Sequence, residues 1–138
     1  AGSELDGRTI PYDNSLEGLV SKKKDFIGKR SLDRKAFIAE DRQKVVGVVP
    51  IDKKTSIPEG SHLVKDSMAP IPNPKLGYIS ASCWSVEYDN PFSLAILKDG
   101  KNMIGQKLFA MSPLKNKTIP VEIVSSHYVD PKGERVRS

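Results

Sequence analysis

Residues 77–97 read GYISASCWSVEYDNPFSLAIL, and this stretch decides the fold class. It holds two apolar and aromatic runs, residues 77–82 and 92–97, each of a length typical of a strand. A tight turn is predicted directly after the second run, at Asp99, Gly100 and Asn102, because these residue types accept the backbone angles that turns require. The stretch therefore predicts two strands followed by a turn.

Further short apolar runs extend this pattern in both directions, at residues 45–49, 62–64, 107–111 and 119–124. Residues 66–74 contain three prolines. They predict a loop, since proline interrupts both helices and interior strands. About six short strands at regular spacing, with little helix between them, are typical of a small antiparallel barrel or sandwich. Of these two we expect the barrel.

The chain changes character near residue 44, and the residues before it look helical. Asp13 and its two neighbours can cap a short helix, and Asp25 can cap a second helix that begins at Phe26. The sequence therefore predicts a mainly β fold. A short N-terminal helical segment, residues 1–43, precedes a C-terminal β-barrel domain, residues 44–138.

Composition bounds the class of protein. Hydrophobic residues make up 38% of the 138 residues and charged residues 28%, which is typical of a globular chain. No apolar run approaches the length of a membrane-spanning helix, and the first residues do not resemble a signal peptide. Because the chain does not begin with methionine, we expect it to be a segment of a longer polypeptide. The single cysteine excludes an internal disulfide and favours a cytoplasmic setting.

Residues that could catalyse a reaction or bind a metal are few. Cys83 would need His127 or His62 as a base, and a lone cysteine in a strand is more often a buried small hydrophobe. One cysteine and two distant histidines give no zinc spacing. Spacing brings no pair of carboxylates together, and phosphate-binding glycine loops are absent. We therefore expect no catalytic residue and no metal site in this chain.

Basic residues concentrate in residues 22–32, which read KKKDFIGKRSL, and in the tail, residues 132–137. At a helix start, free backbone amides and lysines together could hold a carboxylate or phosphate. The alternative is that these lysines are solvated, and for the tail we favour solvation of a frayed terminus. The net charge of +5 also leaves open a basic OB-like barrel that binds single-stranded nucleic acid. Against that alternative, residues 78–92 contain four aromatic residues but no lysine or arginine, so no basic groove lies beside them in the sequence.

Five stretches, in the same order, resemble the aminomethyltransferase superfamily, whose best-known member is the glycine-cleavage T-protein. They read KKKDFIGKRSLDR, VVGVVPID, PEGSHLV, LGYISASCWSVEYDNPFSLAILKDG and VSSHYVDPKGERVR. The lysine-rich first stretch and the last stretch resemble most the branch formed by the alpha subunits of sarcosine oxidase. The alternatives within the superfamily are a T-protein-like aminomethyltransferase and another N-methyl amine dehydrogenase. The resemblance covers nearly the whole chain.

The resemblance implies a function for residues 1–43 as the end of a folate-binding region, with the barrel closing one side of the site. In the parent complex, sarcosine would be oxidatively demethylated with FAD or FMN and NAD bound elsewhere, and the one-carbon unit would pass to tetrahydrofolate. The implied partners are the upstream region of the same subunit and the other subunits of a hetero-oligomer, with no nucleic acid and no membrane. The chain alone is expected to be inactive.

The same resemblance implies three folate-binding candidates: Lys24, Trp84 and Tyr128. Lys24 matches a position where relatives often carry arginine, and lysine offers a point charge in place of a planar fork. The sequence departs from the family pattern at Val86, where proline is usual, and in the His127-Tyr128 pair of the tail.

Overall fold

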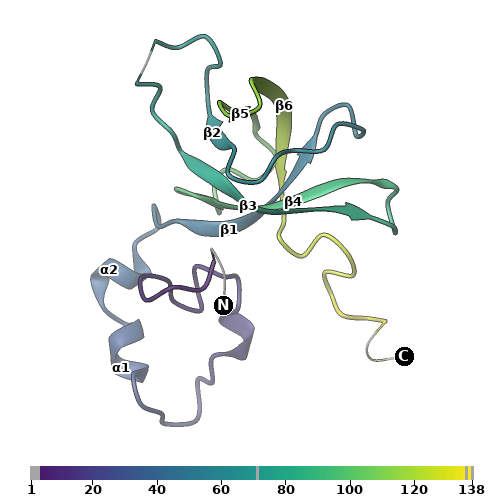
Figure 1. The fold of residues 1–138 in the computed structure, drawn as a ribbon. Coiled ribbons are helices and arrows are strands. Elements are labelled where there is room, and N and C mark those ends of the chain that lie inside the picture. The colour runs from purple at the N-terminus through teal and green to yellow at the C-terminus, as the bar shows by residue number, and fades with distance from the viewer. Residues whose placement is uncertain (1–3, 71, 136, 138) are drawn as a thin grey trace.

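The barrel is closed and antiparallel, with strands in the order β1-β4-β3-β2-β5-β6 (Figure 1). The computed structural model describes residues 4–70, 72–135 and 137. Its strands are β1 Lys44–Pro50, β2 His62–Val64, β3 Gly77–Ser85, β4 Asn90–Leu97, β5 Lys107–Ser112 and β6 Lys117–Val124. The predicted mainly β fold with a small antiparallel barrel is confirmed.

The core lies inside the barrel, where alternate residues of each strand point. In β4, the side chains of Ser93, Ala95 and Leu97 are buried, and residues two apart share one face of a strand. The other core residues follow the same rule on the remaining strands and the loops between them: Val46, Val48, Ile57, Leu63, Ile79, Met103, Leu108, Ala110, Ile119, Val121 and Ile123. Burial of these aliphatic side chains is the main stabilising contribution to the fold.

At Gly47, the outer face of β1 is covered by the Phe92 ring and by the chain that follows β6. It pairs with Leu94 of β4 on one side and with Val124 of β6 on the other. A Cβ atom at this position would lie 2.5 Å from the Ser125 carbonyl oxygen and 2.7 Å from a ring carbon of Phe92. Glycine therefore allows the chain after β6 and the Phe92 ring to close over the strand.

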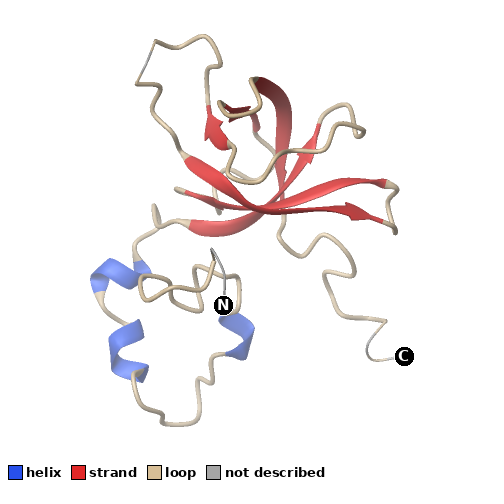
Figure 2. Cartoon of the chain, viewed as in Figure 1, coloured by secondary structure: helices blue, strands red, loops and turns tan. Residues whose placement is uncertain are grey.

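Within its described residues, 4–43, the N-terminal segment holds only single helical turns: η1 Glu17–Leu19, α1 Lys29–Leu32 and α2 Lys35–Ile38 (Figure 2). None of the three buries a residue. Without an apolar face to bury, short helices gain too little to propagate, because nucleation is costly. No helix in the described part of the chain is long and apolar enough to cross a membrane.

Two details of the predicted helices are wrong. The second helix does not begin at Phe26 with Asp25 as its cap; α1 begins at Lys29, after Gly28 in the left-handed conformation (φ 92°). No side chain caps η1 either, because the Asp13 carboxylate is engaged by a distant arginine. Residues 22–24 therefore do not lie at the start of α1, and a four-residue helix has almost no aligned dipole. An anion site formed by these lysines stays a prediction.

Candidate functional site

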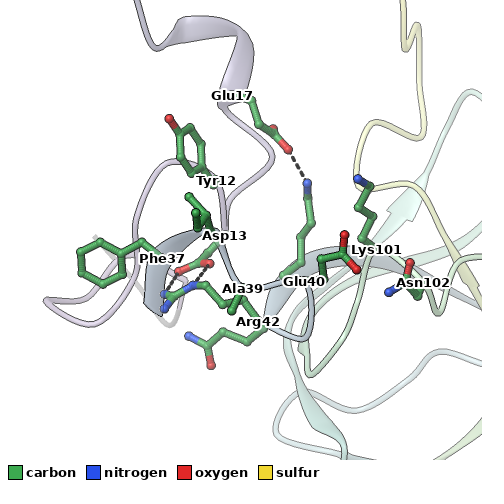
Figure 3. A pocket seen from close by; sticks show the side chains of 12 residues that line it. Tyr12, Asp13, Glu17, Phe37, Ala39, Glu40, Arg42, Lys101 and Asn102 are labelled. Carbon is green, nitrogen blue, oxygen red and sulfur yellow. Dashed lines mark hydrogen bonds and ion pairs between the residues drawn. The ribbon is translucent and has the colours of Figure 1, made fainter. Parts of the chain in front are cut away.

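A pocket of about 430 Å³ lies where the N-terminal segment meets the barrel (Figure 3). Its walls come from three parts of the chain. They are the turn and η1 region with Tyr12, Asp13 and Glu17, the stretch from Phe37 to Lys44, and the β4–β5 connection with Lys101 and Asn102. Two ion pairs within this pocket tie the segment to the barrel.

The first ion pair joins Asp13 to Arg42, which directly precedes β1. Arg42 donates from Nε to Asp13 Oδ1 (2.8 Å) and from a terminal nitrogen to Oδ2 (2.5 Å), a two-pronged contact. The Asp13 side chain is 4% exposed and the Arg42 side chain 22%. The amide of Ile10 also donates to Asp13 (3.1 Å), and the amide of Val45 donates to the Asp13 carbonyl (2.6 Å). Asp13 thus connects the turn before η1 to the first residues of β1.

Arg42 also contacts α2 and the residue range just after β4. Its guanidinium donates to the Ala36 carbonyl in α2 (3.0 Å) and lies 5.2 Å from the centre of the Phe37 ring. Its backbone carbonyl accepts from the amide of Asp99 after β4 (3.1 Å). The hydrogen bond and charge of Asp13 raise the pKa of Arg42, so the guanidinium is charged at every accessible pH. Arg42 is therefore central to the contact between the N-terminal segment and the barrel, here called the junction and formed by the residues that line the 430 Å³ pocket.

The second ion pair joins Glu17 of η1 to Lys44 of β1. Partial burial tends to raise the pKa of Glu17, but the hydrogen bond from Lys44 and the charges of Lys44 and His127 outweigh it, so the pKa lies below its ordinary value. A second pocket of about 230 Å³ shares Glu17, Lys44 and Lys101 with the first and adds His127. The junction is therefore rich in charge. Cations engage two of its carboxylates, Asp13 and Glu17, and Glu40 also lines the first pocket.

Lys24 lies outside this junction, in the loop between η1 and α1. The loop is held by its own contacts: the Lys24 amide donates to Ser21 Oγ (3.0 Å), and Lys29 Nζ donates to the carbonyls of Lys22 (3.2 Å) and Lys24 (2.7 Å). Lys24 is exposed. Figure 1 shows this loop at the far end of the N-terminal segment, away from the β3–β4 hairpin.

Trp84 and Tyr128 both lie at the β3–β4 hairpin, but on opposite faces. Trp84 pairs with Pro91, and Pro91 is fully buried on the inward face of β4. The Tyr128 ring stacks on the next residue, Phe92, with 4.7 Å between the ring centres. Neighbouring residues of a strand point to opposite faces. The structure therefore does not bring these two candidates together, and Lys24 is remote from both.

The tail after β6 is anchored to this hairpin. Tyr88 packs against Tyr128 (ring centres 4.6 Å apart), and Asn90 Nδ2 donates to the Tyr128 hydroxyl (3.2 Å). Arg135 pairs with Glu87 (2.5 Å), and this hydrogen bond lowers the pKa of the Glu87 carboxyl. In the tail at residues 132–137, where a frayed terminus is predicted, Arg135 pairs with Glu87 and its amide donates to Asp130 (3.1 Å), while Lys132 and Arg137 are exposed.

The other residues considered for catalysis or metal binding do not lie close to one another. Cys83 is exposed near one end of β3, whereas His62 pairs with Tyr78 near the other. Five residues of strand separate those positions by about 16 Å. In the described part of the chain no hydrogen bond joins Cys83 to a histidine, and no group of three or more metal-ligating side chains gathers. The carboxylate of Asp130 accepts hydrogen bonds from the backbone amides of Glu134 and Arg135.

Sequence reasoning missed the junction residues Asp13, Glu17, Arg42 and Lys44 as a group. The only signals were an acid in a turn and basic residues directly before a strand. Such signals fix no pairing across 27 to 29 residues.

The chain was compared with protein families, with proteins of known function and with solved structures. No protein-family model matches it. The alpha subunit of sarcosine oxidase from Rhizobium meliloti (strain 1021) is 34% identical over 136 residues, covering 97% of this chain and 14% of that subunit. The alpha subunits from Corynebacterium sp. strains P-1 and U-96 are each 35% identical over 136 residues, with the same coverage. The chain thus spans 14% of the length of these relatives.

Among solved structures, the glycine cleavage system aminomethyltransferase T from Bartonella henselae has the same fold. It superposes with a TM-score of 0.70 at 19% identity, covering 92% of this chain and 34% of that protein. The expected resemblance is confirmed by sequence for the oxidase and by fold for the aminomethyltransferase. At 34–35% identity over nearly its whole length, the chain belongs, as one segment, to the family of sarcosine oxidase alpha subunits.

Proposed function

We propose that this chain is the C-terminal segment of a sarcosine oxidase alpha subunit and helps to form a tetrahydrofolate site. The observation that carries the proposal is the 34–35% identity with three such subunits over 97% of the chain. The aminomethyltransferase T fold supports the folate part of the proposal. In this role, the one-carbon unit from the oxidative demethylation of sarcosine becomes methylenetetrahydrofolate.

The segment alone is proposed to be inactive. Of its junction carboxylates, Asp13 and Glu17 are bound by cations, and Glu87 and Asp130 hold the tail. None of these acids is free to transfer a proton. The flavins and NAD of the parent complex would bind elsewhere, in the cytoplasmic assembly formed with the upstream region and the other subunits.

Two of the three folate candidates are available to a ligand. Lys24 exposes its ammonium group on a loop whose shape is fixed, which suits the anionic glutamate tail of folate. Trp84 exposes half of its indole, which could pack against a planar ring. Tyr128 already has Phe92 on one face and Tyr88 beside it. We propose that Tyr128 contributes to a folate site indirectly, by holding the β3–β4 hairpin in place. The ring is half-buried, and a direct contact with folate stays a prediction.

The test uses the full-length parent protein with its partner subunits. Lys24→Ala is expected to weaken tetrahydrofolate binding, measured by isothermal titration calorimetry, about tenfold, which is the effect of losing one ionic contact of about 1.4 kcal/mol. Lys115→Ala is the matched control, because Lys115 is also exposed but lies in the β5–β6 turn. Equal affinities for the two variants would show that Lys24 has no ligand role.

A second measurement separates the proposal from the alternatives within the superfamily. The assembled protein is expected to oxidise sarcosine and to form methylenetetrahydrofolate when tetrahydrofolate is present. Folate-dependent aminomethyl transfer without amine oxidation would instead support a T-protein-like enzyme. Oxidation of a different N-methyl amine, with sarcosine inert, would support another N-methyl amine dehydrogenase.

A further inference from the structure

The turn end of the β3–β4 hairpin, residues 83–92 and here called the hairpin end, extends beyond the pairing of the barrel sheet. β4 pairs with β1 only from Leu97 back to Ser93, and β3 pairs with β2 only at its first two residues. Among the described residues, the two strands of the hairpin end therefore pair only with each other. Two strands without further neighbours are marginally stable. The position of Trp84, which lies in the hairpin end, therefore depends on contacts other than strand pairing.

Stacked rings hold the hairpin end on its outer face. Gly47 of β1 leaves room for the Phe92 ring, since a Cβ atom there would lie 2.7 Å from a ring carbon. The Tyr128 ring lies on the Phe92 ring with 4.7 Å between their centres and 12° between their planes, and the Tyr88 ring packs beside it. The chain after β6 thus contacts the hairpin end on the face opposite Trp84.

A closed turn in the tail brings Arg135 to the hairpin. The Asp130 carboxylate accepts from the amides of Glu134 (2.8 Å) and Arg135 (3.1 Å). The Asp130 carbonyl accepts from the amide of Gly133 (2.9 Å), whose positive φ of 64° glycine adopts without strain. The Arg135 guanidinium then donates to the carboxylate of Glu87 in the hairpin turn (2.5 Å), 48 residues away in the sequence. Because the closed turn fixes the backbone of Arg135, the ion pair forms at a lower cost in conformational entropy.

We propose that Arg135 is a positioning residue of the tetrahydrofolate site, because its ion pair with Glu87 fixes the hairpin turn and, through the strand, the Trp84 indole. The inference rests on the proposed function, in which Trp84 packs against the planar ring of folate. A hairpin that is fixed before binding loses less freedom when the ligand arrives, so the affinity is higher. Arg135 acts through Glu87 and needs no contact with the ligand.

The test uses the full-length parent protein with its partner subunits and measures tetrahydrofolate affinity by isothermal titration calorimetry. Arg135→Gln and Glu87→Gln are each expected to weaken binding about threefold. The effect is small because the side chains of Arg135 and Glu87 are 64% and 42% exposed, and an exposed ion pair contributes little. The exchanged pair, Glu87→Arg with Arg135→Glu, keeps the attraction and is expected to restore the affinity. Arg137→Gln is the matched control and is expected to bind like the unchanged protein, because Arg137 is also an exposed arginine of the tail.

Hydrogen–deuterium exchange with mass spectrometry, on the same assembled protein, reports on the hairpin without any ligand. The amides of residues 84–90 are expected to exchange about threefold faster in Arg135→Gln and in Glu87→Gln. They are expected to keep their rate in the exchanged pair and in Arg137→Gln. The amides of β5, in the barrel, are the internal reference and should keep their rate in every variant.

Three results would overturn the positioning role alone. The first is unchanged exchange of residues 84–90 in Arg135→Gln, since the ion pair would then not fix the hairpin. The second is a loss of affinity that the exchanged pair does not restore although it restores the exchange rate, which would make Arg135 a direct ligand of folate. The third is full affinity in Arg135→Gln while Trp84→Ala loses affinity. If Trp84→Ala keeps full affinity, the proposed ring contact itself is wrong, and the positioning role fails with it.

Discussion

Replacing Arg42 with methionine is expected to release the N-terminal segment while the barrel stays folded. Methionine keeps an unbranched apolar stem next to Phe37 and removes the charge and all guanidinium hydrogen bonds. The Asp13 carboxylate, 4% exposed, then loses both of its contacts with the guanidinium. The Glu17–Lys44 ion pair and the hydrogen bond from the Val45 amide to the Asp13 carbonyl remain, but η1, α1 and α2 bury no residue and add no apolar anchoring.

The expected magnitude follows from the burial of the pair. Removing one partner of a fully buried ion pair costs about 3–5 kcal/mol, because the other charge is left uncompensated. The Arg42 side chain is 22% exposed, and the freed Asp13 can regain water when the segment opens. We therefore expect about 2 kcal/mol, which corresponds to an increase of about thirtyfold in the open population.

Amide hydrogen exchange measured by NMR resolves this local opening. The amide of Ile10, which donates to Asp13, should exchange about thirtyfold faster in Arg42→Met. The amide of Ile123, bonded to the Gln106 carbonyl within the barrel, should keep its rate. Arg34→Met is the control, because Arg34 is an exposed arginine of the same segment. Equal exchange at Ile10 in the two variants, or faster exchange of Ile123, would refute the reasoning.

A compensating change tests the cause of the opening. If the uncompensated carboxylate of Asp13 drives detachment, then Asp13→Asn added to Arg42→Met should slow the exchange of Ile10 again. The amide side chain can still accept from the Ile10 amide and carries no charge. If the double variant opens as readily as Arg42→Met alone, lost packing is the cause and not the buried charge.

Three further predictions concern the barrel and its loops. Gly47→Ala should lower the free energy of unfolding in urea by about 1–3 kcal/mol, because its Cβ would overlap the Ser125 carbonyl and the Phe92 ring; an unchanged midpoint would contradict this. Tyr128→Ala should speed amide exchange in the tail through loss of the ring stack, whereas Tyr128→Phe, which keeps the stack, should have a smaller effect. Thr55→Val should raise the pKa of Asp52 from about 2 toward 3.8 in a carbon NMR titration, because the Thr55 side chain is the main cause of the lowered value. The turn that Asp52 stabilises is therefore fully favoured above pH 3.8 and weakens as the pH falls toward 2.

The strands could be predicted from the sequence because their signal is local. Alternating or continuous apolar runs bounded by turn residues describe each strand by itself. The predicted ends of β3 and β4 are too short, since Ser85, Asn90 and Pro91 have little strand preference in isolation. They are strand residues because they pair with each other, Trp84 with Pro91 and Ser85 with Asn90. Cross-strand pairing of this kind outweighs single-residue propensity.

The helical segment and the tail could not be predicted because their determinants are not local. Capping residues were present at Asp13 and Asp25, but a cap stabilises only a helix that can also bury a face. The partner of Asp13 is 29 residues away in the sequence, and the partner of the Tyr128 ring, Phe92, lies in a different strand. A single sequence contains no signal for either contact.

The geometry of the β3–β4 hairpin indicates which folate-binding candidate should be tested first. Trp84 and Tyr128 lie on opposite faces of β3 and β4, because successive side chains of a strand point to opposite sides of the sheet. A planar ligand that packs against the Trp84 indole therefore does not also rest on the Tyr128 ring. Because Phe92 and Tyr88 already contact the Tyr128 ring, Trp84 is the better candidate for a ring contact. Loss of folate affinity in Trp84→Ala, with full affinity in Tyr128→Phe, would support this order of importance.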